Sequence, residues 1–198
     1  MRPERHHYHP VVAATRVRVL TILFFFATAI ALALPASAQN DADMDALFEQ
    51  LARTEGEAWR IAESDILREW SKSGSAAMDL LYKRGEEALD QGDLPAAIGH
   101  LTALTDHAPD FAAGWQLRAA AYATAGQFGP AVSDLARALQ LEPRHFAALT
   151  QLGAMLEEIG DSEAALKAYR ESLSIHPHQQ EAIDAVERLE REDQGTEI

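Results

Sequence analysis

The sequence predicts an all-α fold, an α-solenoid built from stacked helical pairs. The chain of 198 residues is rich in alanine and has few aromatic residues, and it lacks the alternation of Val, Ile and Thr that is typical of strands. Residues 78–179 also divide without gaps into three units of 34 residues, 78–111, 112–145 and 146–179. A fixed period of this length indicates helical repeats, in which each unit buries its apolar face against the next.

Small residues recur at the same places of the three units, as the close packing of two helices requires. The eighth place holds Gly85, Ala119 and Gly153. The twentieth place is alanine and the thirty-second is proline in every unit. These residues are Ala97, Ala131 and Ala165, and Pro109, Pro143 and Pro177.

Residues 1–38 have the three parts of a secretory signal peptide. Arginines precede an uncharged apolar run over 19–34, and an A-x-A site ends at Ala38. We therefore expect export and cleavage after Ala38. The alternative is a membrane tether through an uncleaved N-terminal anchor, because the apolar stretch extended to Ala38 reaches the ~20 residues that span a bilayer. Pro35 favours cleavage, since proline interrupts a helix.

Residues 39–77 predict a short polar segment followed by a helical hairpin. Apolar residues between Met44 and Leu51 fall at helical spacing, which indicates a first amphipathic helix. Thr54 and Glu57 then fit a capping box that opens a second helix.

This hairpin lacks the small-residue pattern of the three units. We therefore expect a degenerate N-terminal hairpin that packs against the first unit, with Trp59 and Trp70 in the core of that contact. The alternative for the two tryptophans is an exposed patch that docks a partner.

The turns inside the three units share one chemistry. A glycine stands where the first helix should end, and glycine can adopt the left-handed conformation of a C-cap. A polar residue follows it and suits the N-terminal end of the second helix. The proline at the thirty-second place then ends that second helix, because the residue before proline is pushed out of helical geometry. The glycine and polar pairs are Gly92 and Asp93, Gly126 and Gln127, and Gly160 and Asp161.

Residues 180–198 predict a capping helix and a tail. Apolar residues at helical spacing run from Gln180 to about Glu192, and a repeat array needs an end piece with a polar outer face. Residues 194–198 are expected to be a frayed tail.

The three units resemble tetratricopeptide repeats over the whole of 78–179, and the leader suggests an exported bacterial member of that family. Besides the small residues and prolines, the fourth and twenty-fourth places are large in every unit. The resemblance implies antiparallel helical pairs in a right-handed superhelix, with a concave face lined by the first helix of each unit. It also implies a scaffold for an extended peptide or a partner helix, and only seldom an enzyme. The large residues are Leu81, Trp115 and Leu149, and Leu101, Leu135 and Tyr169.

The resemblance places nine candidate partner-binding residues in the concave groove. Chaperone-binding members of the family hold a C-terminal carboxylate with Lys, Arg and Asn, whereas here Lys83 stands alone among several acids. We therefore expect an apolar or weakly basic segment as the ligand. In the alternative, these side chains pack on the adjacent helices, or a neighbouring segment fills the groove. The nine residues are Tyr82, Lys83, Glu86, Gln116, Leu117, Ala120, Thr150, Gln151 and Ala154.

Charge and composition argue against several functions. The formal net charge is -14, and an acidic surface repels nucleic acid phosphates and anionic lipids. The chain has no cysteine, which excludes disulfides and thiolate chemistry. It also has no nucleophile elbow, phosphate-binding glycine loop or His-Glu-x-x-His motif. We expect no cofactor, no metal and no enzyme activity. Histidines near the turns between units (His107, His145, His176, His178) are expected to be solvated surface residues.

These observations predict a non-enzymatic periplasmic scaffold that binds a protein or peptide and supports a cell-envelope process. The alternative is an assembly factor for a pilus or secretion apparatus, with Trp59 and Trp70 as its docking patch. A hydrolase that uses the turn histidines is the remaining alternative. No membrane span is expected after cleavage of the signal, and self-association through the N-terminal hairpin is compatible with either scaffold role.

Overall fold

A computed structural model of the chain describes residues 36–53 and 56–196. The chain forms two compact units, 1–44 and 45–198, and each is considered by itself. Of the first unit only 36–44 are described, as the beginning of helix α2 (Ala36–Leu51). The predicted signal sequence therefore lies outside the described residues up to residue 35. No helix within the described ranges combines the length and apolarity that crossing a membrane requires.

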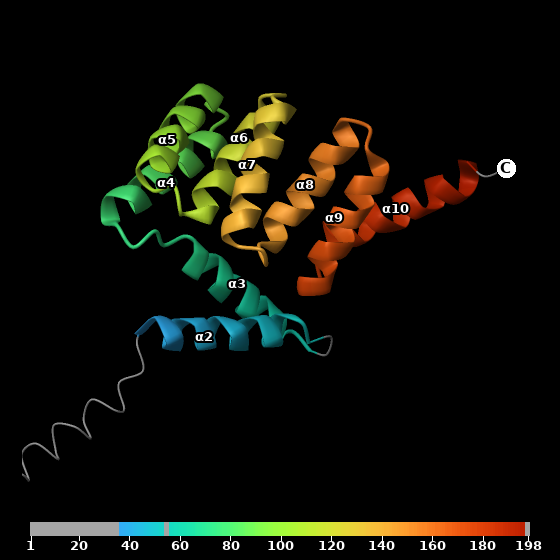
Figure 1. Cartoon of the computed structure of the whole chain (residues 1–198), viewed down its shortest axis with the longest axis horizontal. Coiled ribbons are helices and arrows are strands. Elements are labelled where there is room, and N and C mark those ends of the chain that lie inside the picture. The colour runs from blue at the N-terminus through green and yellow to red at the C-terminus, as the bar shows by residue number, and fades with distance from the viewer. Residues whose placement is uncertain (1–35, 54–55, 197–198) are drawn as a thin grey trace, which may run out of the picture. The chain divides into compact units, whose positions relative to one another are not determined.

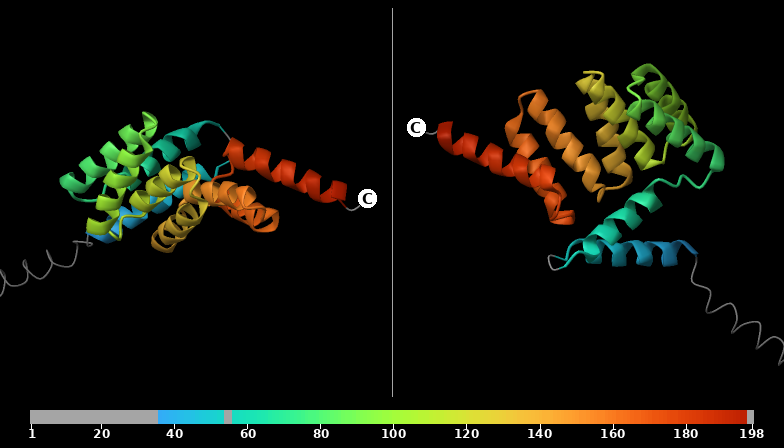
Figure 2. Two further views of the ribbon diagram at one scale, coloured as in Figure 1. Left: turned by 90° about the horizontal axis from the view of Figure 1, so that it is seen from above. Right: turned by 180° about the vertical axis from the view of Figure 1, so that it is seen from behind.

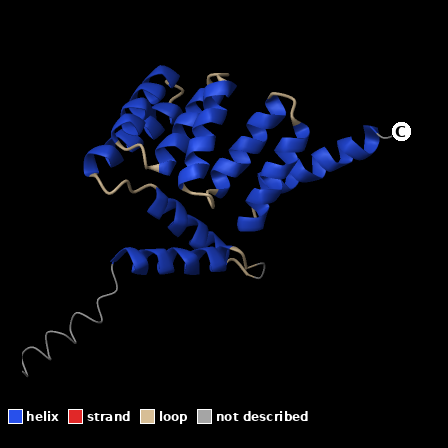
Figure 3. Cartoon of the chain, in the orientation of Figure 1, coloured by secondary structure: helices blue, strands red, loops and turns tan. Residues whose placement is uncertain are grey.

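The second unit contains three antiparallel helical pairs in a row, so the predicted all-α array is confirmed (Figure 1). Each pair packs against the next, and α10 packs against α9. The first helices of successive pairs also contact one another, α4 with α6 and α6 with α8. Figure 3 shows short loops between these helices. The pairs are α4 (Ala76–Asp90) with α5 (Leu94–His107), α6 (Ala112–Thr124) with α7 (Phe128–Leu141), and α8 (Phe146–Glu158) with α9 (Ser162–Ile175), followed by α10 (Gln180–Thr196).

Glycine ends the first helix of each pair, as the turn chemistry predicts. Gly92, Gly126 and Gly160 have positive φ angles of 74°, 70° and 85°, which a side chain would strain. After Gly92, the Asp93 amide donates to the carbonyl of Ala88 at 2.9 Å. The Asp93 carboxylate then caps α5 by accepting from the amide of Ala96. One residue thus closes the first helix of the pair and opens the second.

The small residue at the eighth place is required by the large residue at the twenty-fourth. A Cβ atom on Gly85 would lie 2.5 Å from Cγ of Leu101, and one on Gly153 would lie 2.7 Å from Cε1 of Tyr169. Both distances are shorter than non-bonded carbon contacts allow. The two helices of a pair can therefore approach closely only with glycine at these positions.

A buried ion pair joins α6 to α7 in the middle pair. Arg118 Nε donates to Asp134 Oδ2 at 2.7 Å, and Arg118 Nη2 donates to Asp134 Oδ1 at 2.9 Å. Arg118 Nη1 also donates to Thr105 Oγ1 on α5. The guanidinium lies 4.8 Å from the centre of the Trp115 ring. The planar fork of arginine satisfies all these partners at once, which lysine could not do.

Three predictions about helix ends are wrong. α3 (Ala58–Trp70) has Glu57 as its N-cap without a side-chain capping bond, so the capping box does not start this helix; Thr54 lies outside the described residues. Helix α2 begins at Ala36 rather than near Met44, since no glycine or proline interrupts it. Helix α10 continues to Thr196 rather than ending near Glu192.

The position expected for the N-terminal hairpin is also wrong. α3 does not stack on the first pair as a further repeat. It packs against the turns that precede α8 and α10 (Figure 2), through ring contacts of Trp70 with His145 and Phe146 and of Trp59 with His178. The linker between α3 and α4 turns at Gly74, whose φ is 80°, and this turn lets α3 run back toward the third pair.

Candidate partner-binding groove

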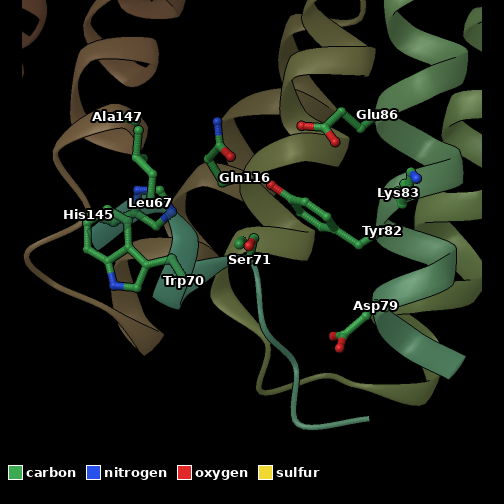
Figure 4. A pocket seen from close by; sticks show the side chains of 11 residues that line it. Leu67, Trp70, Ser71, Asp79, Tyr82, Lys83, Glu86, Gln116, His145 and Ala147 are labelled. Atoms are coloured by element: carbon green, nitrogen blue, oxygen red, sulfur yellow. The ribbon is translucent and has the colours of Figure 1, made fainter. Parts of the chain in front are cut away.

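The first helices of the three pairs, α4, α6 and α8, form one surface, which we call the groove face. A cavity of about 500 Å³ lies between this face and α3, and we call it the α3 cavity. Figure 4 shows Asp79, Tyr82 and Glu86 on α4, facing Trp70 and His145 across the cavity, with Gln116 between them. The cavity is lined by Leu67, Trp70, Ser71, Asp79, Tyr82, Lys83, Glu86, Ala113, Gln116, His145 and Ala147.

The α4 wall of the cavity is acidic and aromatic. Burial, reinforced by the nearby carboxylate of Glu86, raises the pKa of the Tyr82 phenol to about 12. The Tyr82 ring packs edge-on against Phe111, with 5.6 Å between centroids. Tyr82 therefore stays neutral at physiological pH and presents a hydroxyl to the cavity from a fixed ring.

Asp79 connects the α4 wall to the linker that follows α3. The Asp79 carboxylate accepts from the hydroxyl of Ser73 at 2.6 Å and from its amide at 2.7 Å. These hydrogen bonds lower the pKa of Asp79, so its charge persists at neutral pH. Asp79 both fixes the linker and contributes a negative charge to the cavity.

The opposite wall consists of Trp70 and His145, which stack with 4.2 Å between ring centroids. His145 is the N-cap of α8, and its Nδ1 accepts from the amide of Ala148 at 3.4 Å. The residue is only 2% exposed, and this burial lowers the pKa of His145 to about 4. The ring is therefore neutral at pH 7.

Two further histidines fasten the other end of α3. His176 Nε2 lies 3.2 Å from Oε1 of Glu63, and His178 Nε2 lies 2.7 Å from the carbonyl oxygen of Arg53. The indole of Trp59 stacks on His178, with 4.4 Å between centroids. Burial lowers the pKa of His176, although Glu63 and its hydrogen bond act in the opposite direction.

The prediction that the turn histidines are surface residues is wrong for His145 and His176, which are buried. His107 ends α5 and is exposed. Among the described residues, no group of His, Cys, Asp and Glu is arranged to hold a metal ion. Trp59 and Trp70 are engaged within the chain, which argues against their use as an exposed docking patch.

The predicted groove residues divide among three environments. Tyr82, Lys83, Glu86 and Gln116 line the α3 cavity. A second hollow of about 230 Å³, which also reaches α7 and α10, includes the other small or amide groove residues. Of these, Gln151 has a buried Oε1 with no hydrogen-bond partner among the described residues. The groove residues of the second hollow are Ala120, Gln151 and Ala154.

The other two predicted groove residues are turned inward. Leu117 packs against the core of the first pair. Thr150 is 5% exposed, and its hydroxyl lies 2.9 Å from Ser172 Oγ and 2.9 Å from Gln179 Oε1. Neither residue lines the α3 cavity or the second hollow. Their roles are in packing α6 and α8 onto their neighbours.

The sequence prediction missed the α3 side of the groove. Leu67, Trp70 and His145 belong to the cavity wall, but they lie outside the first helices that the repeat pattern singles out. The one sequence feature that pointed to this wall was the pair of tryptophans in α3. The sequence pattern predicts that they contact the first helical pair, whereas they contact the turns that precede α8 and α10.

Comparison with known proteins gives the family. A tetratricopeptide repeat profile matches residues 146–179. A TPR repeat-containing protein of Rhizobium etli is 35% identical over 156 residues, which cover 78% of this chain and 76% of that protein. The chain belongs to the tetratricopeptide repeat family. The similarity to Hsp70-Hsp90 organizing protein 1 of Glycine max is narrower, at 29% identity over 56% of this chain and 19% of that protein.

Solved structures of this TPR protein's relatives share its fold. The first TPR domain of Spaghetti, bound to the HSP90 peptide SRMEEVD, is 26% identical, with a TM-score of 0.56 over 58% of this chain and 90% of that one. The Sgt2 TPR domain from Aspergillus fumigatus is 23% identical, with a TM-score of 0.59 over 62% of this chain and 83% of that one. Both likenesses leave part of this chain unmatched.

Proposed function

We propose that this chain is a non-enzymatic scaffold that binds an extended segment of a partner protein on its groove face. The observation that carries the proposal is the α3 cavity, where polar and aromatic side chains converge from α3, α4, α6 and α8. Its volume of about 500 Å³ lies within the range of ligand sites in proteins. Family membership supports the same role, since TPR proteins are in general non-catalytic scaffolds.

The partner differs from the acidic peptide that the Spaghetti domain binds. That peptide, SRMEEVD, carries three acidic residues. Here the cavity wall includes Asp79 and Glu86, which would repel such a sequence. A neutral or basic segment suits the cavity better.

We further propose that the scaffold is exported and acts in the periplasm on a cell-envelope process. The support is the basic, apolar and A-x-A pattern over residues 1–38. Mass spectrometry of the protein isolated from its own cells tests this: a periplasmic form beginning at Gln39 is expected. An intact N-terminus in the cytoplasmic fraction would exclude export, and an intact N-terminus in the membrane fraction would indicate the uncleaved anchor.

Affinity capture with matched variants tests the scaffold role. Full-length protein carrying a C-terminal tag is expressed in its own cells as wild type, Gln116→Arg and Gln140→Arg. Gln116 lines the α3 cavity, whereas Gln140 is exposed on α7. A partner retained by wild type and Gln140→Arg but lost from Gln116→Arg is expected. Recovery of the same proteins with all three forms would contradict binding in the groove.

A further inference from the structure

No ion pair within the described part of the chain neutralises the carboxylates of Asp79 and Glu86 in the α3 cavity. Glu86 lines the cavity and has no ion-pair partner among the described residues, and Asp79 is bonded only to the uncharged Ser73. The single cation in the lining is Lys83. Lys83 Nζ lies 3.6 Å from Oε1 of Glu87, which is outside the cavity lining. Two carboxylates therefore line the cavity, and the lysine on the same helix is paired with a third carboxylate, that of Glu87.

The aromatic rings of the cavity add to its preference for a cation. Tyr82 on α4 and Trp70 on α3 stand on opposite sides (Figure 4). The faces of Trp and Tyr rings attract ammonium and guanidinium groups within about 6 Å. A long, positively charged side chain that enters the cavity would pass along these rings and end at Glu86.

His145 supplies a second, independent feature on the opposite wall. Its Nδ1 accepts from the Ala148 amide, so in the neutral ring the hydrogen is on Nε2. This Nε2 is buried and has no hydrogen-bond partner among the described residues. A buried donor without an acceptor is unfavourable, and His145 lines the cavity. Because Nε2 is closed off from solvent in the unbound chain, the ring must turn toward the cavity for the carbonyl oxygen of a bound peptide to accept from it.

We infer that the α3 cavity binds an arginine or lysine side chain of an extended partner segment, one of whose backbone carbonyls accepts a hydrogen bond from His145. The inference rests on the proposed scaffold function and names the chemistry of its ligand. Glu86 and Asp79 pair with the cation, Trp70 and Tyr82 contact its apolar stem, and His145 orients the backbone. The donor and the acids occupy opposite walls of the cavity (Figure 4).

Other ligand chemistries fit the cavity less well. An acidic side chain would meet two carboxylates of the same sign. An apolar side chain would bury those carboxylates without a counter-charge, which is costly. A basic side chain supplies the counter-charge for the acidic wall, and a backbone carbonyl of the same segment supplies the acceptor for His145.

Peptide binding tests the inference directly. Fluorescein-labelled peptides of sequence Ala-Ala-Xaa-Ala-Ala are titrated with the full chain, with arginine, its uncharged analogue citrulline, or glutamate at Xaa, and anisotropy is recorded. The arginine peptide should bind about tenfold more tightly than the citrulline peptide. The glutamate peptide should bind more weakly than either.

Two variants locate the effect. Glu86→Gln should weaken binding of the arginine peptide about fivefold and leave the citrulline peptide unchanged. Asp90→Asn makes the same charge change one turn farther along α4, outside the cavity lining, and should have little effect. Both positions are exposed, so neither variant should fail to fold.

The outcomes separate the inference from the scaffold role. Equal binding of the arginine and citrulline peptides would overturn the cation inference while leaving peptide binding intact. Equal effects of Glu86→Gln and Asp90→Asn would also overturn it, because the affinity for the arginine peptide would then depend on the net charge of the chain and not on the cavity carboxylate. If no peptide binds, the inference fails, and the capture experiment with Gln116→Arg still decides the scaffold role.

Discussion

The indole of Trp70 stacks on the imidazole of His145, with 4.2 Å between centroids and 26° between planes. The contact joins the last residue of α3 to the N-cap of α8. The first two helical pairs, α4 to α7, lie between these two residues in the sequence. It makes α3 one wall of the groove, so an element outside the repeats determines the space open to a ligand.

Replacing Trp70 should release α3 from the third pair. Trp70→Ala removes the stack on His145 and the contact with Phe146, at a cost of about 2 kcal/mol for a partly buried aromatic residue. Amide exchange in α3 should rise roughly thirtyfold, while α6 and α7 stay protected. Ile61→Ala serves as the control, since Ile61 on the same helix is 65% exposed. Unchanged exchange in α3 would show that Trp70 does not hold it.

Acid should loosen the same contact. Burial lowers the pKa of His145 to about 4 and also lowers that of His176. The conformation in which α3 is packed therefore favours the neutral form of both imidazoles. Once α3 separates, the pKa values return toward 6.5. For His145 the stabilisation is therefore complete above pH 6.5 and declines, by up to about 1.4 kcal/mol per pH unit, as the pH falls toward 4. The lowered pKa of His176 acts in the same direction.

Urea unfolding at several pH values between 7.5 and 4.5 measures this slope. His145→Asn keeps an N-cap residue and removes the titrating ring, so the slope should flatten. His107→Gln changes an exposed histidine and should leave the slope as it is in the wild type. Identical slopes in all three proteins would rule out His145 as the source.

Gly153 should not tolerate a side chain, because the Tyr169 ring lies directly opposite. Gly153→Ala places a Cβ atom 2.7 Å from the Tyr169 ring, and the resulting shift should cost about 1–3 kcal/mol. Gly99→Ala is the matched change in α5, where a Cβ atom meets no atom within 4 Å. It should stabilise by about 0.5–1 kcal/mol through helix propensity. Thermal unfolding of both variants checks the opposite signs.

The Arg118–Asp134 pair should not tolerate lysine. The two side chains are 12% and 7% exposed and share two hydrogen bonds, so Arg118→Lys should lower the free energy of unfolding by about 2–4 kcal/mol. Arg170→Lys alters the Arg170–Glu190 pair, which is 58% and 42% exposed. That change should cost less than about 0.5 kcal/mol. Denaturant unfolding measures both changes. Comparable losses of unfolding free energy in Arg118→Lys and Arg170→Lys would contradict the argument that burial makes the Arg118–Asp134 pair sensitive.

The repeats could be predicted because the residues that determine their helix ends and helix contacts lie close together in the sequence, within a single unit. Gly92 followed by Asp93 specifies a helix end and the next helix start within two residues, and Gly85 with Leu101 specifies one close helix contact inside a single unit. The same period assigned the family and placed Tyr82 and Gln116 on the groove face.

The α3 wall could not be predicted because it depends on contacts distant in sequence. Trp70 meets His145, and Trp59 meets His178, after the chain has turned at Gly74. No repeat position marks these partners, and histidines beside turns are more often solvated. Thr150 was misplaced for a related reason: its inward hydrogen bonds use Ser172 and Gln179, which lie on later elements.

Photo-crosslinking at the groove tests the central claim most directly. Benzoylphenylalanine is placed at position 116 in the α3 cavity or at position 140 on α7, and the full chain is irradiated in its own cells. The groove account predicts a discrete protein adduct at 116 that is absent at 140. No adduct at 116, or the same adducts at both positions, would contradict binding of a partner segment in the groove.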